Sequence, residues 1–387
     1  MRLAVYSHKA CWRCATSPTG FATDGGFPMQ MAALSELFDE TVLVVPCSDE
    51  HGKPGERHLQ GRNLAVCPVG YPRGVGFARK CDMVGWTARN SKALFGTLRW
   101  ADAVHAPIPG DVGTIGMLLA WAARKPLFVR HCGNWMAQRT LAERLWRWFM
   151  ERQAGGRNVM MATGGAETSP TVRNSHVQWV FATSLREEEM ATLAPQRRAP
   201  RPPVLRLVTV GRQESGKGTD IAVKALALLR RQWPSVTLQV LGSGSQLGVL
   251  RELAEAAGVG PAVLLRGSVS HEAVMQGLRE SDVFTFPTAS EGFPKAVLEA
   301  MAAGLPVVTS RVSVLPHLVS RGGGIALSDC TPEAVAQALL DIAGDEERYL
   351  AASTAARDTA AVYTLEAWQA YLRKAMEEAW QRPLRQA

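Results

Sequence analysis

The stretch from Thr288 to Ser310, "TASEGFPKAVLEAMAAGLPVVTS", contains the pair of glutamates Glu291 and Glu299. A Phe-Pro dipeptide lies between them, and mostly apolar residues follow it. Pro294 suits the first position of a helix, where its missing N–H is no loss. Gly304 suits a left-handed helix cap. We therefore predict that Glu291 lies in a loop and that Glu299 lies inside a helix that starts at Pro294.

This arrangement offers binding of a phosphate together with binding of sugar hydroxyls. Backbone N–H groups at the start of the helix, around Phe293, form an anion site. Glu291 in the loop can reach hydroxyl groups, and Glu299 can accept two hydrogen bonds from a diol such as ribose. The alternative is a solvated loop acid and a solvated helix residue. The apolar neighbours of Glu299 favour the first interpretation, because an acid in a buried helix usually has a partner.

A second candidate site is "VTVGRQESGKGTD", residues 208–220, at the end of an expected strand. Gly211 ends the strand, and Arg212 and Lys217 follow it among further glycines. A guanidinium fork and a mobile ammonium are the groups that a diphosphate needs. A surface turn with solvated charges fits this stretch equally well. The spacing differs from that of a P-loop.

These stretches belong to a regular alternation of apolar strands and amphipathic helices, which predicts parallel sheets with crossover helices. Residues 193–203, "LAPQRRAPRPP", disfavour regular structure and are interpreted as a linker. The fold class that we predict is α/β, with two doubly wound Rossmann-like domains facing each other across a cleft. The expected domains are 1–195 and 204–363, with a helix at 364–387 that packs back towards the first domain. In such sheets, ligands bind at the carboxyl ends of the strands.

The composition is that of an ordinary soluble protein, with 387 residues, 47% hydrophobic and 20% charged. The longest uncharged apolar run, Ile115–Ala123, is far shorter than a membrane span. The N-terminal residues lack the apolar core of a signal peptide. We therefore expect a cytoplasmic protein.

The net charge of +8 lies entirely in residues 1–200. An anionic membrane surface, a phosphorylated substrate or nucleic acid would each fit this asymmetry, and so would a solvated basic face. Residues 77–100 and 139–153 mix Arg and Lys with Trp and Phe, which suits a helix at an anionic lipid surface or simply a packed helix with charged edges. No known nucleic-acid-binding motif is present, so we expect no nucleic-acid partner.

Seven cysteines, an odd number, argue against a disulfide framework. The pair Cys11 and Cys14 forms a single CxxC, whereas a zinc ribbon needs two. We expect a flexible loop here rather than a metal or redox site. The chain contains no Asp-x-Asp, so we also expect no metal at the candidate site and no cofactor.

Together the motifs resemble those of retaining glycosyltransferases with the GT-B fold, in particular family 4 (glycosyl transferases group 1). Glu291 and Glu299 match the E-x7-E motif of this family, and "GRQESGKG" matches its G-R-x4-K-G element. Gly25-Gly26 resembles the N-terminal glycine loop, and His131 matches a histidine that commonly follows that strand. The resemblance is continuous over about 204–330 and weaker over 1–190. One departure is His317, which stands where the family often has an acid.

The resemblance implies a role for each of these residues. Arg212 and Lys217 would bind the donor diphosphate and stabilise the leaving group. Glu299 would bind the ribose. Glu291, together with the backbone of the adjoining loop, would contact the transferred sugar and its phosphate. The loop and strand-end residues of this donor site are Gly211, Gly292, Phe293 and Pro294.

Residues from other strand ends complete the implied site. Gly25 and Gly26 would allow the donor diphosphate to approach closely. His131 would lie near the sugar. Val269 and its neighbours would face the base.

The function that the resemblance implies is transfer of a hexosyl or N-acetylhexosaminyl group from a nucleotide-sugar donor, with a UDP-sugar as the expected donor, to an acceptor hydroxyl. Candidate acceptors include lipid-linked or membrane-proximal molecules in glycan, glycolipid or glycoside biosynthesis, with the protein cytoplasmic or peripheral at the inner face of the membrane. Two alternatives remain open. The chain could be an enzyme resembling nucleotide-sugar 2-epimerases, or a non-catalytic partner that binds sugar nucleotides.

Overall fold

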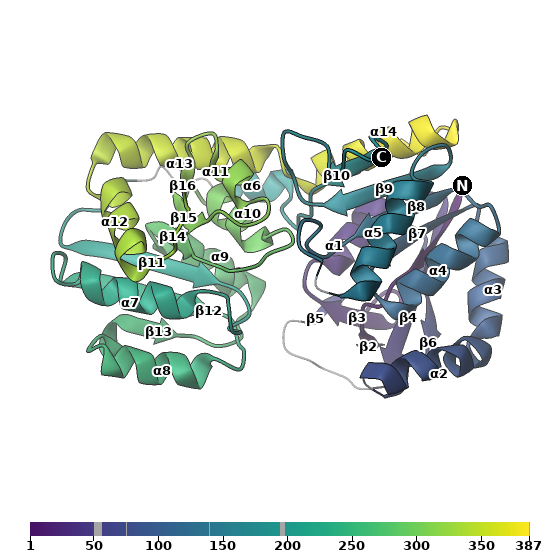
Figure 1. Ribbon diagram of the computed structural model, residues 1–387, viewed down its shortest axis with the longest axis horizontal. Helices are drawn as coiled ribbons and strands as arrows, with labels where there is room; N and C mark the ends of the chain where they lie inside the picture. The colour runs from purple at the N-terminus through teal and green to yellow at the C-terminus, as the bar shows by residue number, and fades with distance from the viewer. Residues whose placement is uncertain (50–55, 75, 139, 194–197, 387) are drawn as a thin grey trace. The chain divides into compact units, whose positions relative to one another are not determined.

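The computed structural model describes residues 1–49, 56–74, 76–138, 140–193 and 198–386 (Figure 1). The chain divides into two compact units. Unit 1 consists of residues 1–184 and 365–387, and unit 2 of residues 185–364. The division after Ser184 falls before the segment 193–203 that the sequence suggests as a linker, and residues 194–197 of that segment lie outside the described residues.

The described part of unit 1 contains a ten-stranded sheet, in which β6 pairs with β4 off the main path β10-β9-β8-β7-β1-β4-β2-β3-β5. Its strands are β1 (Arg2–Tyr6), β2 (Cys11–Arg13), β3 (Phe21–Asp24), β4 (Glu40–Ser48), β5 (Glu56–His58), β6 (Leu64–Val69), β7 (Ala103–Ile108), β8 (Leu127–His131), β9 (Asn158–Thr163) and β10 (Val177–Val180). All pairs are parallel except β2 with β3 and β3 with β5. The helices of this unit are α1 (Phe27–Ser35), α2 (Gly76–Arg89), α3 (Ser91–Trp100), α4 (Asp111–Ala122), α5 (Leu141–Gln153) and α14 (Leu365–Trp380).

The strands of unit 1 are apolar on both faces, as expected for a parallel sheet covered by helices on each side. Along β1, Leu3 and Val5 belong to one core cluster, whereas Ala4 and Tyr6 belong to another. The first cluster is completed by α1 and α14, and the second by α2 to α5. This alternation with a period of two explains why one strand serves two cores.

The last helix, α14, is part of the core of unit 1 although it comes last in the chain. Trp368, Leu372 and Met376 on this helix are fully buried in the cluster that also contains Leu34 and Phe38. The i, i+4, i+8 spacing of the three residues places them on one helix face. Unit 1 therefore needs both ends of the described chain to close its core.

A small antiparallel extension of the sheet replaces the flexible loop that we expected around Cys11 and Cys14. Residues 11–13 and 21–24 form strands β2 and β3, and β5 pairs with β3. Cys11 aligns with Cys47 of β4 in the parallel register. The expectation of a flexible loop was wrong because β2 and β3 are held in the sheet by β4 and β5, which come from distant segments that no local pattern shows.

Unit 2 has a fully parallel six-stranded sheet in the order β13-β12-β11-β14-β15-β16. Its strands are β11 (Val204–Val210), β12 (Ser235–Leu241), β13 (Val263–Leu265), β14 (Val283–Phe286), β15 (Val307–Ser310) and β16 (Gly324–Leu327). Its helices are α6 (Glu187–Thr192), α7 (Thr219–Leu229), α8 (Leu247–Ala256), the 3-10 turn η1 (Gly260–Ala262), α9 (His271–Glu280), α10 (Lys295–Ala302), α11 (Leu315–Val319), α12 (Pro332–Ala343) and α13 (Glu346–Ala361).

The faces of this second sheet are also buried on both sides. Leu205 and Leu207 of β11 belong to a core with α7, α8 and α12, whereas Val208 and Val210 belong to one with α9 to α11 and α13. In Figure 1, α7 and α12 lie together over part of this sheet. The predicted fold class, α/β with two doubly wound units, is therefore confirmed.

Candidate functional site

The loops that follow β11 and β14 come together in unit 2. The backbone N–H of Ala289 donates to the carbonyl oxygen of Gly216 at 2.8 Å. The hydroxyl of Thr288 also lies within 3.3 Å of this oxygen. The two motifs singled out in the sequence, which are about 80 residues apart, thus form one site at the carboxyl ends of neighbouring strands.

Lys217 and Glu291 form an ion pair across this junction. The ammonium of Lys217 also lies 3.5 Å from the carbonyl oxygen of Ser290. Both charged side chains are half-buried, with 23% and 15% of their side-chain surface exposed. Lys217 is therefore positioned by the glutamate loop while part of its charge still faces solvent.

The loop after β11 depends on glycine for its shape. Gly218 has φ +77°, and a Cβ placed there would lie 2.0 Å from the carbonyl oxygen of Pro287. A Cβ on Gly242, after β12, would lie 2.0 Å from the carbonyl oxygen of Gly211. A side chain is therefore impossible at either position without backbone movement. This close packing of main chain on main chain sets the position of the residues between Gly211 and Gly218.

Gln213 is a buried residue that organises the same loop and that the sequence did not reveal. Its side-chain oxygen accepts a hydrogen bond from the hydroxyl of Thr219 at 2.7 Å, and its amide donates to the carbonyl oxygen of Gly211 at 2.7 Å. Its backbone N–H donates to Ser243 of the next loop. Arg212 beside it is exposed. A polar residue between two charged ones gives no signal of burial, so only the structure could identify this role.

Helix α10 begins at Lys295, with Pro294 as its N-cap residue rather than its first helical residue. Gly304 has φ +73° after the last turn, as predicted for a left-handed cap. Every residue of α10 is buried except Lys295, Ala296 and Glu299, which are half-buried. Glu299 therefore lies on a narrow, partly exposed face of α10, which it shares with Lys295 and Ala296 of the first turn.

The segment Gly292–Pro294 is held by the loop after β15. The hydroxyl of Ser313 donates to the carbonyl oxygen of Gly292 at 3.0 Å, and Phe293 packs against Tyr363 with ring centroids 6.0 Å apart. Ser313 lies in the stretch where the sequence departs from the family pattern, and His317 follows it in α11. Ser313 contacts the glutamate loop through its hydroxyl group, without a carboxylate.

Val269, expected near the base, follows β13 and is half-buried against the core of unit 2. Its neighbour Gly267 accepts a hydrogen bond from the backbone N–H of Gly242 at 2.8 Å. Backbone hydrogen bonds therefore connect the loop after β11 to the loop after β12, and the loop after β12 to the loop after β13. The other predicted residues, Gly25, Gly26 and His131, lie in unit 1.

Gly25 and Gly26 connect β3 to α1. Gly25 has φ +69°, and a Cβ placed on it would have no atom within 4 Å. Gly26 is the N-cap residue of α1, with Pro28 in the first turn. The backbone of this turn is therefore open to a ligand, whereas Gly218 and Gly242 of unit 2 pack against their own chain.

His131, at the end of β8, is fully buried, and its ring nitrogens meet no hydrogen-bond partner of normal geometry among the described residues, although the backbone of Gly133 lies close. Its ring meets that of Trp135 edge to face, with centroids 5.3 Å apart. Burial lowers the pKa of His131, so the neutral ring is favoured. The structure thus places His131 at the predicted strand end, but encloses its ring.

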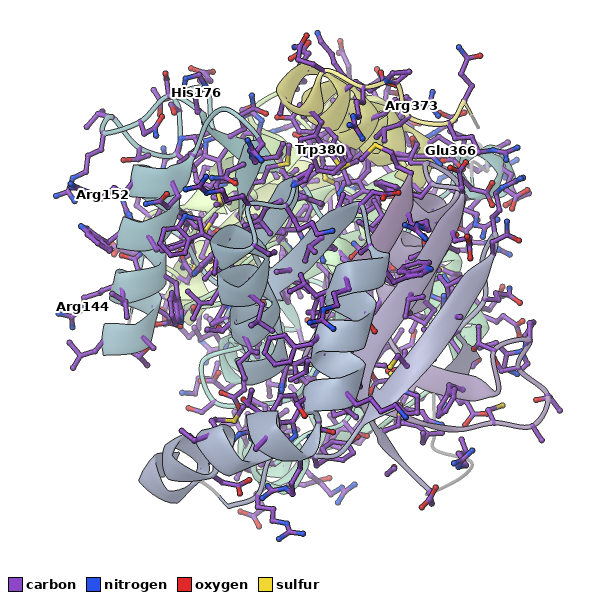
Figure 2. All side chains as sticks on the ribbon, turned by 90° about the vertical axis from the view of Figure 1, so that its right-hand side faces the viewer. Arg144, Arg152, His176, Glu366, Arg373 and Trp380 are labelled. Carbon is purple, nitrogen blue, oxygen red and sulfur yellow. The ribbon has the colours of Figure 1, made fainter. Side chains whose placement is uncertain are left out.

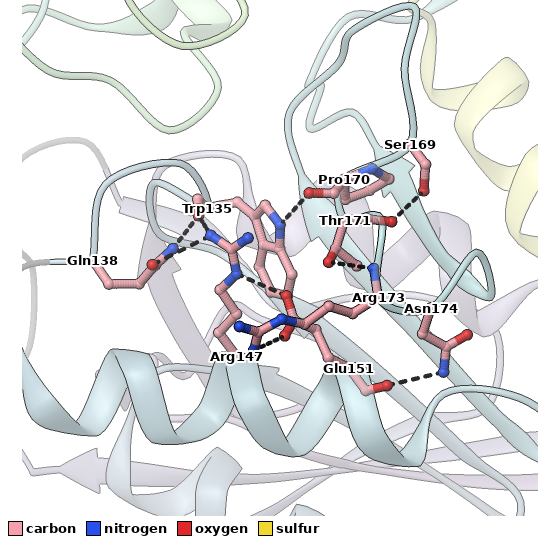
Figure 3. Close-up of polar contacts among 9 residues, drawn as sticks. All are labelled: Trp135, Gln138, Arg147, Glu151, Ser169, Pro170, Thr171, Arg173 and Asn174. Carbon is pink, nitrogen blue, oxygen red and sulfur yellow. Dashed lines mark hydrogen bonds and ion pairs between the residues drawn. The ribbon is translucent and has the colours of Figure 1, made fainter.

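A network of aromatic and charged groups holds the loop beyond His131 (Figure 3). The indole N–H of Trp135 donates to the carbonyl oxygen of Pro170 at 3.0 Å, and the Arg147 guanidinium lies 5.0 Å from the ring centre. Arg147 is paired in turn with the buried carboxylate of Glu151 at 2.9 Å. Glu151 also meets Arg173 at 3.4 Å. This ion pair fixes the ring that covers His131.

Helix α5 also carries a mixed apolar and basic surface, which borders this network, because Arg144 and Trp148 line a pocket together with Arg147 and Glu151. Leu141, Leu145 and Trp148 are exposed by 80%, 50% and 50% at i, i+4 and i+7 spacing. Arg144 and Arg152 project from the same helix, away from the sheet (Figure 2). Arg139, which the sequence grouped with them, lies outside the described residues, as do the side chains of Phe77 and Lys80. No helix in the described part of the chain is long and apolar enough to cross a membrane.

Comparisons with known proteins find a family match over most of unit 2. Residues 195–359 match the family model of "glycosyl transferases group 1". D-inositol 3-phosphate glycosyltransferase of Corynebacterium urealyticum is 32% identical over 165 residues, which is 41% of this chain and 39% of that relative. The chain thus matches about two fifths of the length of this relative. The resemblance inferred from the motifs is confirmed over this segment.

Solved structures resemble the chain over nearly all its length. Sucrose-phosphate synthase from Thermosynechococcus elongatus has a TM-score of 0.68 at 16% identity, covering 98% of this chain and 99% of that one. HepE from Anabaena, solved in complex with UDP-glucose, has a TM-score of 0.69 at 13% identity, covering 98% and 100%. At these identities the similarity establishes the fold, and that fold is GT-B.

Proposed function

From the match of unit 2 to glycosyl transferases group 1, we propose that this chain is a glycosyltransferase that moves a sugar from a nucleoside-diphosphate sugar to an acceptor hydroxyl, with retention of the anomeric configuration. The observation that carries the proposal is the convergence of the Lys217 and Glu291 loops beside the start of α10. This junction combines a cation, a carboxylate and a helix N-terminus at the carboxyl ends of parallel strands. A sugar diphosphate carries the matching groups.

In the proposed reaction, negative charge grows on the diphosphate as its bond to the sugar breaks. Arg212 and Lys217 neutralise this charge, and the N-terminus of α10 adds a fixed dipole. Since Lys217 is already held by Glu291, little reorganisation is needed when the charge develops. Transfer then requires no metal at the diphosphate.

The two glutamates act on hydroxyl groups. Glu299, on the half-buried face of α10, binds the two hydroxyls of the ribose. Glu291, in the loop before this helix, binds hydroxyls of the transferred sugar and keeps Lys217 in place. We propose attack by the acceptor hydroxyl on the same face from which the diphosphate leaves, because no carboxylate stands out as a covalent nucleophile.

We propose uridine as the base of the donor, since the similar protein HepE was solved with UDP-glucose. The test is thermal unfolding with UDP, GDP and ADP, on the wild type and on Glu299→Ala. One nucleotide, present at 100 times its dissociation constant, should stabilise the wild type by about 2.7 kcal/mol. Glu252→Ala, an exposed glutamate on α8, is the matched control and should behave as the wild type.

The outcomes separate the remaining alternatives. Stabilisation by none of the nucleotides, or equal stabilisation of Glu299→Ala, would contradict the donor site. A nucleotide that binds without any transfer to a panel of acceptors would favour a non-catalytic binding partner. Isomerisation of the donor sugar in the absence of acceptor would identify an enzyme of the 2-epimerase type.

We further propose that the acceptor is lipid-linked or lies at a membrane, and that the exposed face of α5 contacts anionic lipid. Leu141, Leu145 and Trp148 would enter the interface while Arg144 and Arg152 meet phosphate groups. A protein of this kind would act at the inner face of the membrane, in the synthesis of a glycan or glycolipid. Residues 1–200 also carry the whole net positive charge of the chain, which favours contact with anionic lipid.

Sedimentation with vesicles tests this contact. Binding to vesicles of phosphatidylglycerol and phosphatidylcholine should exceed binding to phosphatidylcholine alone, and should fall with salt. Arg144→Ala with Arg152→Ala should weaken it by about 30-fold, from roughly 1 kcal/mol per charge. Leu145→Glu should also weaken binding, because it removes an apolar side chain from this face, whereas Val249→Glu at an exposed apolar position of α8 in unit 2 should not. Absence of sedimentation at low salt would overturn the proposal.

A further inference from the structure

The antiparallel extension β2–β3–β5 brings together three side chains that the proposed transfer does not use. Cys14, which follows β2, and Glu56 and His58 of β5 place a sulfur, a carboxylate oxygen and a ring nitrogen within 4.8 Å of one another. We propose that these three residues form a binding site for a divalent cation with affinity for thiolate, and that Zn²⁺ is the ion that fits best. Thiolate, carboxylate and imidazole are the ligand types that zinc takes in proteins.

The distance from the sulfur to the carboxylate is close to that of a zinc site, and all three ligand atoms lie within 4.8 Å of one another. Two ligand atoms on a tetrahedral zinc lie roughly 3.3–3.8 Å apart, given bonds of about 2.0–2.3 Å. The sulfur of Cys14 is 3.2 Å from Oε1 of Glu56. The hydroxyl of Thr16 is 3.2 Å from the sulfur and 3.2 Å from Nε2 of His58. Small side-chain rotations would therefore bring all three ligand atoms onto one ion.

A neighbouring side chain already orients the carboxylate. The indole N–H of Trp12 donates to Oε2 of Glu56, which leaves Oε1 directed towards Cys14. Trp12 is itself buried in the small cluster that contains Cys14. A hydrogen bond from outside the ligand shell to a ligating carboxylate is typical of metal sites.

The exposure of the ligands gives the ion a route and an open position. Cys14 is 8% exposed, Glu56 is half-buried and His58 is exposed. A cation could therefore enter from the His58 side, with water as its fourth ligand. On binding, the S–H bond of Cys14 breaks, the sulfur gives an electron pair to zinc, and the proton leaves to solvent.

The ion would act on the turn that carries Gly25. Cys14 directly follows β2 and Glu56 lies on β5, the two strands that pair with β3, and Glu56 lies opposite Asp24, the residue before Gly25. A cation bound to both strands would clamp β3 from its two neighbours. The site would thus be structural and would stabilise the glycine turn, and its existence does not depend on the proposed transfer.

A second pair of thiols, Cys11 and Cys47, lies in the same part of the sheet and must be distinguished from the proposed zinc site. Cys11 aligns with Cys47 of β4, and the two thiols interact with each other. Cys11 and Cys14 therefore do not act together as a CxxC pair, because their sulfurs have different partners. Replacement of Cys11 and Cys47 by serine tests whether this pair binds the ion instead.

The experiment is a titration of the metal-free, reduced full chain with Zn²⁺ by calorimetry, and with Co²⁺ by absorption spectroscopy. We expect one ion per chain and a sulfur-to-cobalt charge-transfer band. Cys14→Ser should remove the band, and His58→Gln should weaken zinc binding by at least 10-fold. Trp12→Phe, which removes the indole hydrogen bond to Glu56, should weaken zinc binding by about 10-fold.

Matched controls come from the same unit. Cys132→Ser and His176→Gln replace an exposed cysteine and an exposed histidine and should bind zinc as the wild type does. Zinc should raise the Tm of the wild type but not that of His58→Gln, whose exposed side chain can be replaced without loss of the fold. The proposal is overturned if the wild type binds no stoichiometric zinc, or if Cys14→Ser and His58→Gln bind zinc as tightly as the wild type. It is also overturned if zinc binding is lost only in the double variant of Cys11 and Cys47.

Discussion

The charged loops of unit 2 and the enclosed ring of His131 in unit 1 both follow carboxyl ends of parallel strands, but different forces hold them. In unit 2, main chain packs against main chain at Gly218 and Gly242, and the functional side chains stay partly exposed. In unit 1, buried aromatic rings and the ion pair of Arg147 with Glu151 surround the residue of interest. Backbone shape therefore sets the first site, and tertiary side-chain contacts set the second.

The largest effect that we expect concerns the core of unit 1. Trp368→Ala in α14 should destabilise this unit by about 3–5 kcal/mol, because a fully buried ring is lost. Hydrogen exchange read by mass spectrometry should then quicken in β1 and β9 and stay unchanged in β11 and β14. Tyr371→Ala, at a partly exposed position of the same helix, is the control. Equal quickening in both units would show that their stabilities are not separate.

The next effect tests the role of backbone packing in unit 2. Gly218→Ala should destabilise this unit by about 3 kcal/mol, from a strained positive φ together with the contact to Pro287. Gly248→Ala, where a Cβ would meet no atom within 4 Å, should be neutral or stabilise by up to about 1 kcal/mol. Chemical denaturation measures both. Equal stability of the two variants would show that the contact of Gly218 with Pro287 does not determine the position of the loop after β11.

The charge of Lys217 should matter for turnover more than for folding. Lys217→Ala, or Arg212→Ala, should lower kcat by about 10²-fold, which corresponds to roughly 2.7 kcal/mol in the activation free energy. The reason is the loss of one preorganised positive charge that stabilises the leaving diphosphate. Lys224→Ala, an exposed lysine of α7, should leave kcat unchanged. Steady-state kinetics on the donor gives the answer. Turnover close to normal in both site variants would refute the assignment.

The smallest effect is an acid sensitivity confined to unit 1. Burial, reinforced by the Arg130 guanidinium, lowers the pKa of His105 to about 3. The unfolded chain binds this proton near pH 6.5, so stability is complete above that value and falls as the pH drops towards 3. Between pH 6.5 and pH 5 the loss should be about 2 kcal/mol.

Denaturation at pH 7.5 and pH 5 measures this difference. His105→Asn keeps a donor for the carbonyl oxygen of Phe128, which lies 3.1 Å from Nδ1 of His105 in the wild type. The variant should reduce the acid-dependent loss and leave the part due to His131, whose pKa is also lowered by burial. His176→Asn, at an exposed position, should retain it. The same pH dependence in His105→Asn and the wild type would exclude this histidine as the cause.

The sequence predicted much of unit 2 because its signals are local. The helix and cap around Glu299, the strand before Gly211, and the position of Glu291 in a loop all follow from neighbouring residues. The one misplaced detail, Pro294 as N-cap instead of first helical residue, is a shift of one position. Gln213 escaped prediction because its burial depends on packing between two loops.

In unit 1 the local sequence patterns predicted only the regular strands and helices. Strand β5 pairs with β3 across more than 30 residues, so the proximity of Glu56 and His58 to Cys14 has no local signature. The enclosure of His131 by Trp135 likewise depends on Arg147 and Glu151, which lie on α5 and hold this ring in place. Contacts of this kind arise only when the sheet is complete.

Because α14 supplies part of the core of unit 1, the order in which the chain leaves the ribosome matters for its folding. Unit 2 is continuous, from Leu185 to Thr364, and all its strands are available before the last residues are made. Unit 1 must wait with the apolar face around Leu34 and Phe38 uncovered until α14 is synthesised. Unit 1 is therefore completed only after unit 2 has been made, and a chain that ends before α14 would have only its second unit intact.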